Sequence, residues 1–142
     1  MIEVRRARDQ SEIDAALDLR YEVFCREQGV TLEEERDGRD REALHLVALD
    51  AGTVIATCRL LVEGTTVTLG RMAVAAAQRG LGVARRLLAA SEPCARELGA
   101  TRIVLAAQLT ARALYESAGY EPYGEVFLDA GIDHVMMAKA LS

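Results

Sequence analysis

The sequence predicts a single α/β (α+β) domain, 1–142, in which a mixed, mostly antiparallel sheet of six to seven strands carries helices on both faces. Three observations predict this fold class. Short runs rich in β-branched residues follow one another with turn residues between them, as in antiparallel strands. A later run, 101–107, is continuously apolar, which is typical of a strand buried on both faces. Helical segments lie on each side of that run, and no repeat or linker divides the chain.

The first third of the chain is predicted to contain a short strand, a helix and a charged segment. Residues 2–7 alternate weakly between apolar and charged, and Asp9 or Ser11 then begins a helix. An apolar stripe runs along this helix to its expected end near Gly29, formed by Ile13, Leu17, Tyr21 and Phe24. Between 32 and 42 almost every residue is charged, which indicates a solvated loop or a short polar helix.

The middle of the chain is predicted to form neighbouring antiparallel strands. The runs 44–50 and 53–63 are separated by Ala51-Gly52, which predicts a hairpin. A second turn at Glu63-Gly64 leads into a third strand at 66–74.

The rest of the chain alternates helices with strands. A helix follows the third strand and a glycine-rich segment, and it is expected to reach about Gly99. Pro93 lies inside this helix and lacks an N–H group, so we expect it to kink or interrupt the helix. The elements after it are the buried strand 101–107, a short helix at 109–117, and two strands at 120–128 and 134–140 with a turn at 129–133.

Composition narrows the classes of partner. The formal net charge of −5 and the absence of a concentrated basic face argue against nucleic acid as a partner. The amino terminus lacks the apolar core of a secretory signal, and no apolar run is long enough to span a bilayer, so we expect a cytoplasmic protein with no membrane partner. Three widely spaced cysteines and only two histidines indicate reduced, packed thiols and no metal site.

The segment QRGLGVA, 78–84, lies between an apolar strand and a helix. The unpaired N–H groups of a helix amino terminus bind anions, and glycines let the backbone approach closely. A Walker A loop is excluded because no lysine follows Gly82, and a dinucleotide fingerprint is excluded because the segment comes late, after hairpins. The pattern that fits is R-x-x-G-x-A, formed by Arg79, Gly82 and Ala84.

With this pattern in its strand and helix context, the chain resembles the GCN5-related N-acetyltransferase (GNAT) superfamily, whose pyrophosphate signature is [QR]-x-x-G-x-[GA]. The resemblance covers most of the chain, because LGRMAV, TRIVLAA and LYESAGY follow the family's order. The segments LRYEVFCREQGV and GIDHVMM, the acidic loop with Asp37 and Asp40, and His45 resemble a bacterial ElaA-like subgroup.

The resemblance implies acetyl-CoA, or a related acyl-CoA, as the donor substrate. Its pyrophosphate would lie on main-chain amides of 79–84, with Arg79, Arg85 or Arg86 supplying charge; Arg85 and Arg86 are equally well explained as solvated helix residues. The strand before the loop is expected to carry a bulge and to splay from its parallel neighbour, where one N–H would polarise the thioester carbonyl. The donor-binding residues are therefore predicted to be Met72, Ala73, Val74, Arg79, Gly80, Leu81, Gly82, Val83, Ala84 and Arg85.

The family pattern also implies catalytic candidates. Tyr115 matches the tyrosine that donates a proton to the leaving thiolate in many members. A base must accept the proton of the amine, and the candidates are Glu27, His45, Glu125 and His134, of which Glu27 and His134 lie nearest to the expected acceptor pocket. Arg59 could hold an acidic group of the acceptor or form a structural ion pair.

The leading hypothesis is an acetyl-CoA-dependent N-acetyltransferase in which an amine attacks the thioester directly. The alternative is a CoA-binding regulatory or degenerate GNAT domain without efficient turnover, and a nucleotide-binding module is a third reading. The acceptor is expected to be a small-molecule or peptide amine whose identity stays open. The last strands offer a surface for a homodimer, which the sequence does not decide.

Overall fold

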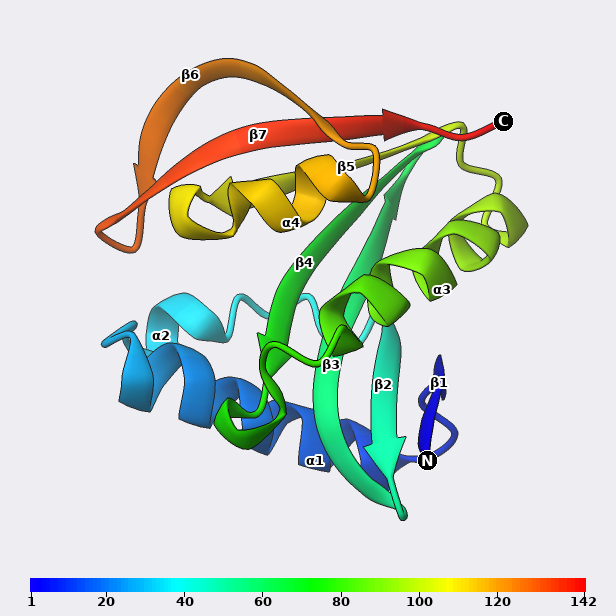
Figure 1. Ribbon diagram of the computed structural model, residues 1–142, viewed down its shortest axis with the longest axis vertical. Helices are drawn as coiled ribbons and strands as arrows, with labels where there is room; N and C mark the ends of the chain where they lie inside the picture. Colours follow the sequence, from blue (N-terminus) through cyan, green and yellow to red (C-terminus); the bar gives the residue numbers. More distant parts are fainter.

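The computed structural model describes all 142 residues. Its strands form one seven-stranded sheet with the order β1-β2-β3-β4-β5-β7-β6 (Figure 1). Only the β4–β5 pair is parallel, so the predicted mixed, mostly antiparallel sheet is confirmed. The strands are β1 (Ile2–Arg6), β2 (Leu44–Asp50), β3 (Thr53–Glu63), β4 (Thr66–Val74), β5 (Arg102–Gln108), β6 (Glu121–Asp129) and β7 (Ile132–Ala140).

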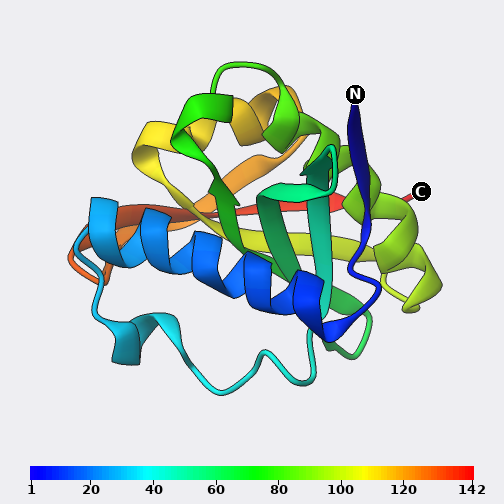
Figure 2. The same cartoon turned by 90° about the horizontal axis from the view of Figure 1, so that it is seen from below.

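Helices cover both faces of the sheet, as predicted. Figure 2 shows α1 (Gln10–Arg20) and α2 (Leu32–Glu35) on one side and α3 (Val83–Glu97) and α4 (Arg112–Ser117) on the other. Two 3₁₀ turns, η2 (Ala76–Gln78) and η3 (Leu109–Ala111), precede α3 and α4.

The first helix differs from its expected form in its second half. Asp9 is the N-cap and accepts a hydrogen bond from the Glu12 amide at 3.0 Å, so α1 begins at Gln10. From Tyr21 to Glu27 the same helix widens into the π-helix η1, a form that is uncommon and concentrated at functional sites. Gly29, with a φ of 73°, follows its end. The periodicity of the sequence predicts a helix here but does not separate α from π geometry.

The charged segment contains both predicted alternatives. Thr31 forms a capping box with Glu34, which begins the short helix α2, and the residues after Glu35 form a loop.

Pro93 does not interrupt α3, which runs unbroken from Val83 to Glu97. Pro93 and Ala89 both lie on the solvent-exposed side of the helix. Water can therefore bind the Ala89 carbonyl that Pro93 leaves without an N–H partner.

The two faces of the sheet are buried in different ways. The face under α3 carries a core of 20 buried residues, among them Leu46, Leu60, Leu69 and Leu87. The face under α1 has only a small apolar cluster of Ala16, Val47 and Leu49. Its other buried side chains include Arg20, Glu35 and Arg59, so much of this face is held by ionic contacts.

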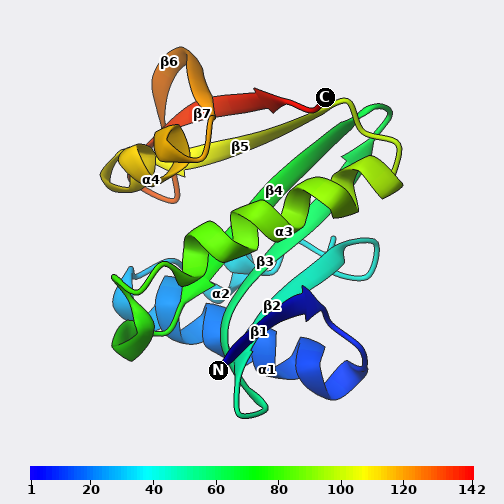
Figure 3. The ribbon, with the colours of Figure 1, turned by 45° about the vertical axis from the view of Figure 1, so that its right-hand side comes forward.

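The centre of the sheet is opened by a bulge and a divergence. On β4, Arg71 and Met72 both fall opposite Cys58 of β3, because the register shifts between Thr57 and Arg59. Between β4 and β5, pairing covers only Thr66–Thr68 with Arg102–Val104, and the strands then separate (Figure 3). The expected bulge and splay of β4 are therefore present.

Candidate active site

A cleft of about 690 Å³ occupies the gap between the diverging halves of β4 and β5. One end is lined by the loop before α3 and the first turn of α3, and the other by η1 and α2. Because those helices lie on opposite faces, the cleft passes through the sheet. Two ligands that enter from opposite faces can therefore meet between β4 and β5.

The glycine segment forms the open amino terminus of α3. Gly82 is the N-cap with a φ of 79°, and Gly80 has a φ of 78°, both in the left-handed region that favours glycine. The amides of Val83, Ala84 and Arg85 have no intrahelical partner, because they begin the helix, and no side chain caps this end. They point out of a 15-residue helix whose dipole favours an anion at this end.

The basic residues near the amino terminus of α3 lie in different environments. Arg85 lines the cleft. Arg86 instead donates to the Ile2 carbonyl at 2.9 Å and is directed to the edge of the sheet. Leu81 is 66% exposed and lies outside the cleft lining, so its side chain is not part of the cleft.

Arg79 is joined to Glu27 of η1. Its Nη1 and Nη2 atoms donate to the two carboxylate oxygens at 2.8 and 2.9 Å, and its Nε donates to the Val74 carbonyl at 3.0 Å. The bonds from Arg79 lower the pKa of Glu27. Glu27 lies outside the cleft lining, and a carboxylate held in this way is a weaker base than a free one.

The predicted donor residues of β4 divide into positions that line the cleft and one that is buried. Met72 and Val74 line the cleft, whereas Ala73 is 1% exposed and pairs with Thr57. Met72 has no register partner on β3 or on β5, because it lies in the bulge opposite Cys58 and beyond the last β4–β5 pair.

Tyr115 reaches the cleft from α4 while remaining 7% exposed. Burial raises its pKa to about 12, and the neighbouring Cys58 thiol acts in the same direction. Its ring packs edge-on against Tyr120, with centroids 6.2 Å apart. The phenol therefore keeps its proton at neutral pH and has one available to donate.

His134 lies at the start of β7, lines the cleft and is 8% exposed. Its ring stacks on Phe127 with centroids 5.9 Å apart, and its Nδ1 lies 2.7 Å from the Ile132 carbonyl. A carbonyl only accepts, so Nδ1 carries the proton, and in the neutral ring Nε2 has the free lone pair.

The other two base candidates lie away from the cleft. The His45 Nε2 atom donates to the Asp40 carbonyl at 2.9 Å, which is a structural contact. Glu125 is exposed on β6 and does not line the cleft.

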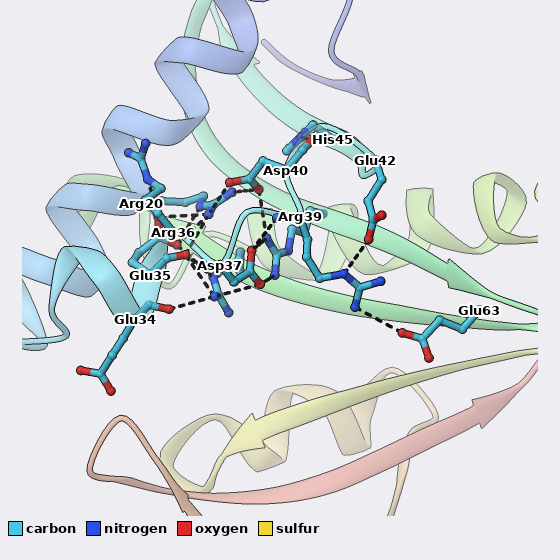
Figure 4. A network of polar contacts seen from close by, with 12 residues as sticks. Arg20, Glu34, Glu35, Arg36, Asp37, Arg39, Asp40, Glu42, His45 and Glu63 are labelled. Atoms are coloured by element: carbon cyan, nitrogen blue, oxygen red, sulfur yellow. Dashed lines mark hydrogen bonds and ion pairs between the residues drawn. The ribbon is translucent and has the colours of Figure 1, made fainter.

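A buried ionic network forms the wall of the cleft next to α2 (Figure 4). Glu35, with a fully buried side chain, accepts hydrogen bonds from Arg20 of α1, Arg36 and Arg71 of β4. Arg59 pairs with Asp37 and Asp40, so it forms an ion pair within the protein. Hydrogen bonding by Arg59 holds the pKa of Asp37 well below its usual range.

Sequence reasoning missed several cleft residues. Arg71 stands alone among apolar residues in LGRMAV, a signal that could have marked it. Glu35 is one of five consecutive charged residues in the run EEERD and carries no such signal. Gln28 and Gln108 also line the cleft and are hydrogen-bonded to each other at 2.9 Å, so they join the end of η1 to the end of β5.

No group of three or more His, Cys, Asp or Glu side chains is placed to hold a metal ion. The chain also has no helix with the length and apolar character needed to cross a membrane.

Comparison with known proteins agrees with this architecture. The family model described as "Acetyltransferase (GNAT) domain" matches residues 8–141. The uncharacterized N-acetyltransferase YjcF of Bacillus subtilis is 34% identical over 134 residues, which are 94% of this chain and 96% of YjcF. An acyl-CoA N-acyltransferase structure from Pseudomonas aeruginosa is 31% identical, with a TM-score of 0.85 and 99% of each chain covered.

The chain belongs to the GNAT acetyltransferase family, and the prediction of an acyltransferase is confirmed. Within the family it is similar to Escherichia coli ElaA, whose crystal structure is 29% identical with a TM-score of 0.86 over 98% of this chain and 99% of that one. The predicted ElaA-like subgroup is thus confirmed. An aminoglycoside 6'-N-acetyltransferase complexed with coenzyme A shares the fold at 18% identity and a TM-score of 0.76, with 99% of this chain and 96% of that one covered.

Proposed function

We propose that this protein transfers the acetyl group of acetyl-CoA to a primary amine, which attacks the thioester directly. One observation carries the proposal. A single cleft joins the uncapped amino terminus of α3 to a protonated phenol, Tyr115, and to an imidazole with a free Nε2, His134.

The residues at the α3 end suit the donor. The pyrophosphate would accept from the amides of Val83, Ala84 and Arg85, with the guanidinium of Arg85 or Arg79 beside it. The pantetheine arm would lie along Met72 and Val74, where β4 has no strand partner on the β5 side. Bound acetyl-CoA supplies the activated acyl carbon.

The cleft residues account for the two proton transfers that the reaction needs. As the amine nitrogen forms a bond to the acyl carbon, the carbon–sulfur bond breaks and the thiolate takes the phenolic proton of Tyr115. The proton lost by the amine goes to Nε2 of His134. The Met72 amide, at a bulge position without a register partner on β3 or β5, would donate to the carbonyl oxygen as it gains charge.

The ion pair of Arg79 with Glu27 supports a second candidate function, which is CoA binding without efficient turnover. In that pair one donor-binding arginine is already engaged, and one base candidate is held as a carboxylate. If this second function is correct, the protein binds the donor, but no amine causes CoA to be released.

Two measurements test the proposal. Thermal unfolding with acetyl-CoA, ATP or NAD should show the largest rise in Tm with acetyl-CoA, because a ligand that binds the folded state stabilises it. A screen of amines for acetyl-CoA-dependent release of CoA should then identify acceptors. A Tm rise without release by any amine would support the binding-only function, and preference for ATP or NAD would refute both.

The two histidines provide a matched test of the base. His134→Gln should lower kcat by about 100-fold, the order of a general base. His45→Gln, which loses only the contact with the Asp40 carbonyl, should lower Tm while kcat stays near wild type. Equal kcat values for both variants would remove His134 from the reaction.

A further inference from the structure

Arg71 has a backbone conformation that arginine rarely adopts. Its φ is 53°, in the left-handed region, and it lies in the bulge of β4 opposite Cys58 of β3. The glycine beside it, Gly70, does not have a positive φ. The left-handed conformation is therefore adopted by Arg71, which has a long side chain, and not by the adjacent Gly70.

The side chain of Arg71 is fixed to α2. Its Nε donates to the Glu35 carboxylate at 2.9 Å and to the Glu35 carbonyl at 3.2 Å. Its Nη2 donates to the carbonyls of Glu34 and Glu35 at 3.3 and 3.1 Å. These acceptors belong to a helix on the face of the sheet opposite α3, so the contact connects the bulge to a separate element.

The acceptor of these bonds is itself held in place. The Glu35 side chain is fully buried, and Arg20 donates to both of its carboxylate oxygens, at 3.0 and 2.7 Å. A buried carboxylate with several charged donors has little freedom to move. The bonds from Arg71 thus end on a rigid group.

The backbone of Arg71 determines the direction of the next amide, that of Met72. Met72 lines the cleft, and in the bulge it has no register partner on β3 or on β5. We propose that Arg71 is a positioning residue, whose contact with Glu35 holds the bulge so that the Met72 amide points at the thioester carbonyl. This inference rests on the proposed acetyl transfer.

Three substitutions at this position separate backbone positioning from ligand binding. Arg71→Ala removes the contact and leaves a β-carbon in a left-handed conformation, so the bulge should relax and kcat should fall by about 10–100-fold. Arg71→Gly also removes the contact but adopts a positive φ without strain, and it should retain a kcat several-fold above that of Arg71→Ala. Arg71→Lys, which keeps one donor, should lie between Arg71→Ala and wild type. The KM values for acetyl-CoA and for the amine should change by less than about threefold in all three.

Arg36→Ala is the matched control. Arg36 donates to the same Glu35 carboxylate at 2.9 Å, but it lies outside the bulge and is not part of the cleft lining. Its kcat should stay near wild type. Circular dichroism and Tm should verify that every variant is folded.

A binding measurement tests the amide without turnover. Acetyl-carba(dethia)-CoA, in which a methylene group replaces the thioester sulfur, has a ketone carbonyl in the place of the thioester carbonyl and cannot transfer an acyl group. Wild type should bind this ketone analogue more tightly than CoA, by about 5–10-fold, the value of one hydrogen bond. Arg71→Ala should lose this preference and still bind CoA.

The outcomes distinguish this inference from the proposed function. Equal kcat loss in Arg71→Ala and Arg71→Gly together with a raised KM for the amine would show that Arg71 binds the acceptor. Wild-type kcat in Arg71→Ala, or no preference of the wild type for the ketone analogue over CoA, would overturn the positioning role. A normal preference without turnover on any amine would overturn only the proposed reaction.

Discussion

Arg79 and Glu27 lie 52 residues apart in the chain and form an ion pair with two hydrogen bonds, at 2.8 and 2.9 Å. The pair connects the loop before α3 to the π-helix η1, and Arg79 also donates to the Val74 carbonyl on β4. Three segments that border the cleft thus meet at one guanidinium. A pyrophosphate at the α3 end would compete with Glu27 for it.

Glu27→Gln should tighten the binding of CoA by about 2–5-fold, because it removes an ion pair that competes with the ligand and exposed ion pairs are weak. Isothermal titration calorimetry with CoA measures this change. Glu22→Gln, which removes a carboxylate that pairs with Arg26 on the same helix, should leave the affinity unchanged. Weaker CoA binding in Glu27→Gln would show that the pair holds Arg79 ready for the ligand. A kcat loss of about 100-fold would instead identify Glu27 as the base.

Tyr115→Phe should lower kcat by about 100-fold while the affinity for CoA stays within about twofold, because only the proton donor is lost. Burial raises the pKa of Tyr115 to about 12, so the wild type should show no loss of kcat from its ionisation up to about pH 10. Steady-state kinetics and CoA titrations measure both effects. Tyr120→Phe is the control, because Tyr120 packs against Tyr115 but does not line the cleft. If both variants keep the wild-type kcat, Tyr115 is not the acid.

Gly82→Ala should destabilise the fold by about 1 kcal/mol and weaken CoA binding, because alanine is strained at a φ of 79°. A β-carbon at this position would meet no atom within 4 Å, so the cost is conformational. Gly38 also has a φ of 79° and open space around it, but it lies in the acidic loop. Gly38→Ala should therefore cost similar stability without changing CoA affinity. Similar CoA affinities for Gly82→Ala and wild type would separate this loop from the donor site.

Asp37→Asn should reduce Tm at pH 7 and make it less dependent on pH in acid. The pKa of Asp37 in the folded protein is below the ordinary value of 3.8, because Arg59 donates to its carboxylate. The unfolded chain therefore takes up the proton first, and the stabilisation by Asp37 is present above about pH 4 and is lost as the pH falls further. Thermal unfolding from pH 7 to pH 3 should show the two Tm values converging. Asp18→Asn, an exposed carboxylate on α1, should leave the shape of the curve unchanged. A constant gap between wild type and Asp37→Asn would refute this linkage.

The sequence predicts most of the fold because the signals for it are local. Hairpins at Ala51-Gly52, the apolar run of β5 and the glycines before α3 each depend on a few neighbouring residues, and the structure contains all of them. The continuity of α3 through Pro93 depends on which side of the helix faces solvent, which requires the packed structure.

The candidate site is only partly predictable for the same reason. The motif at 78–84 and the tyrosine of α4 are visible in the sequence. The contacts of Glu35 with Arg20 and Arg71 span 15 and 36 residues, and no local pattern connects them. Likewise, the sequence predicts a donor-binding role for Arg79 and a base role for Glu27 separately, and only the structure shows that the two side chains pair.

The sheet consists of two sub-sheets, β1–β4 and β5–β7, whose strands pair along only three residue pairs. Beyond this short seam the two sub-sheets are joined by side-chain packing, because one core cluster contains residues of both, such as Leu69 and Leu105. A ligand that contacts both β4 and β5 takes the place of the strand pairing that the sheet lacks. A ligand in the gap would therefore add contacts across the sheet where its own hydrogen bonds are missing.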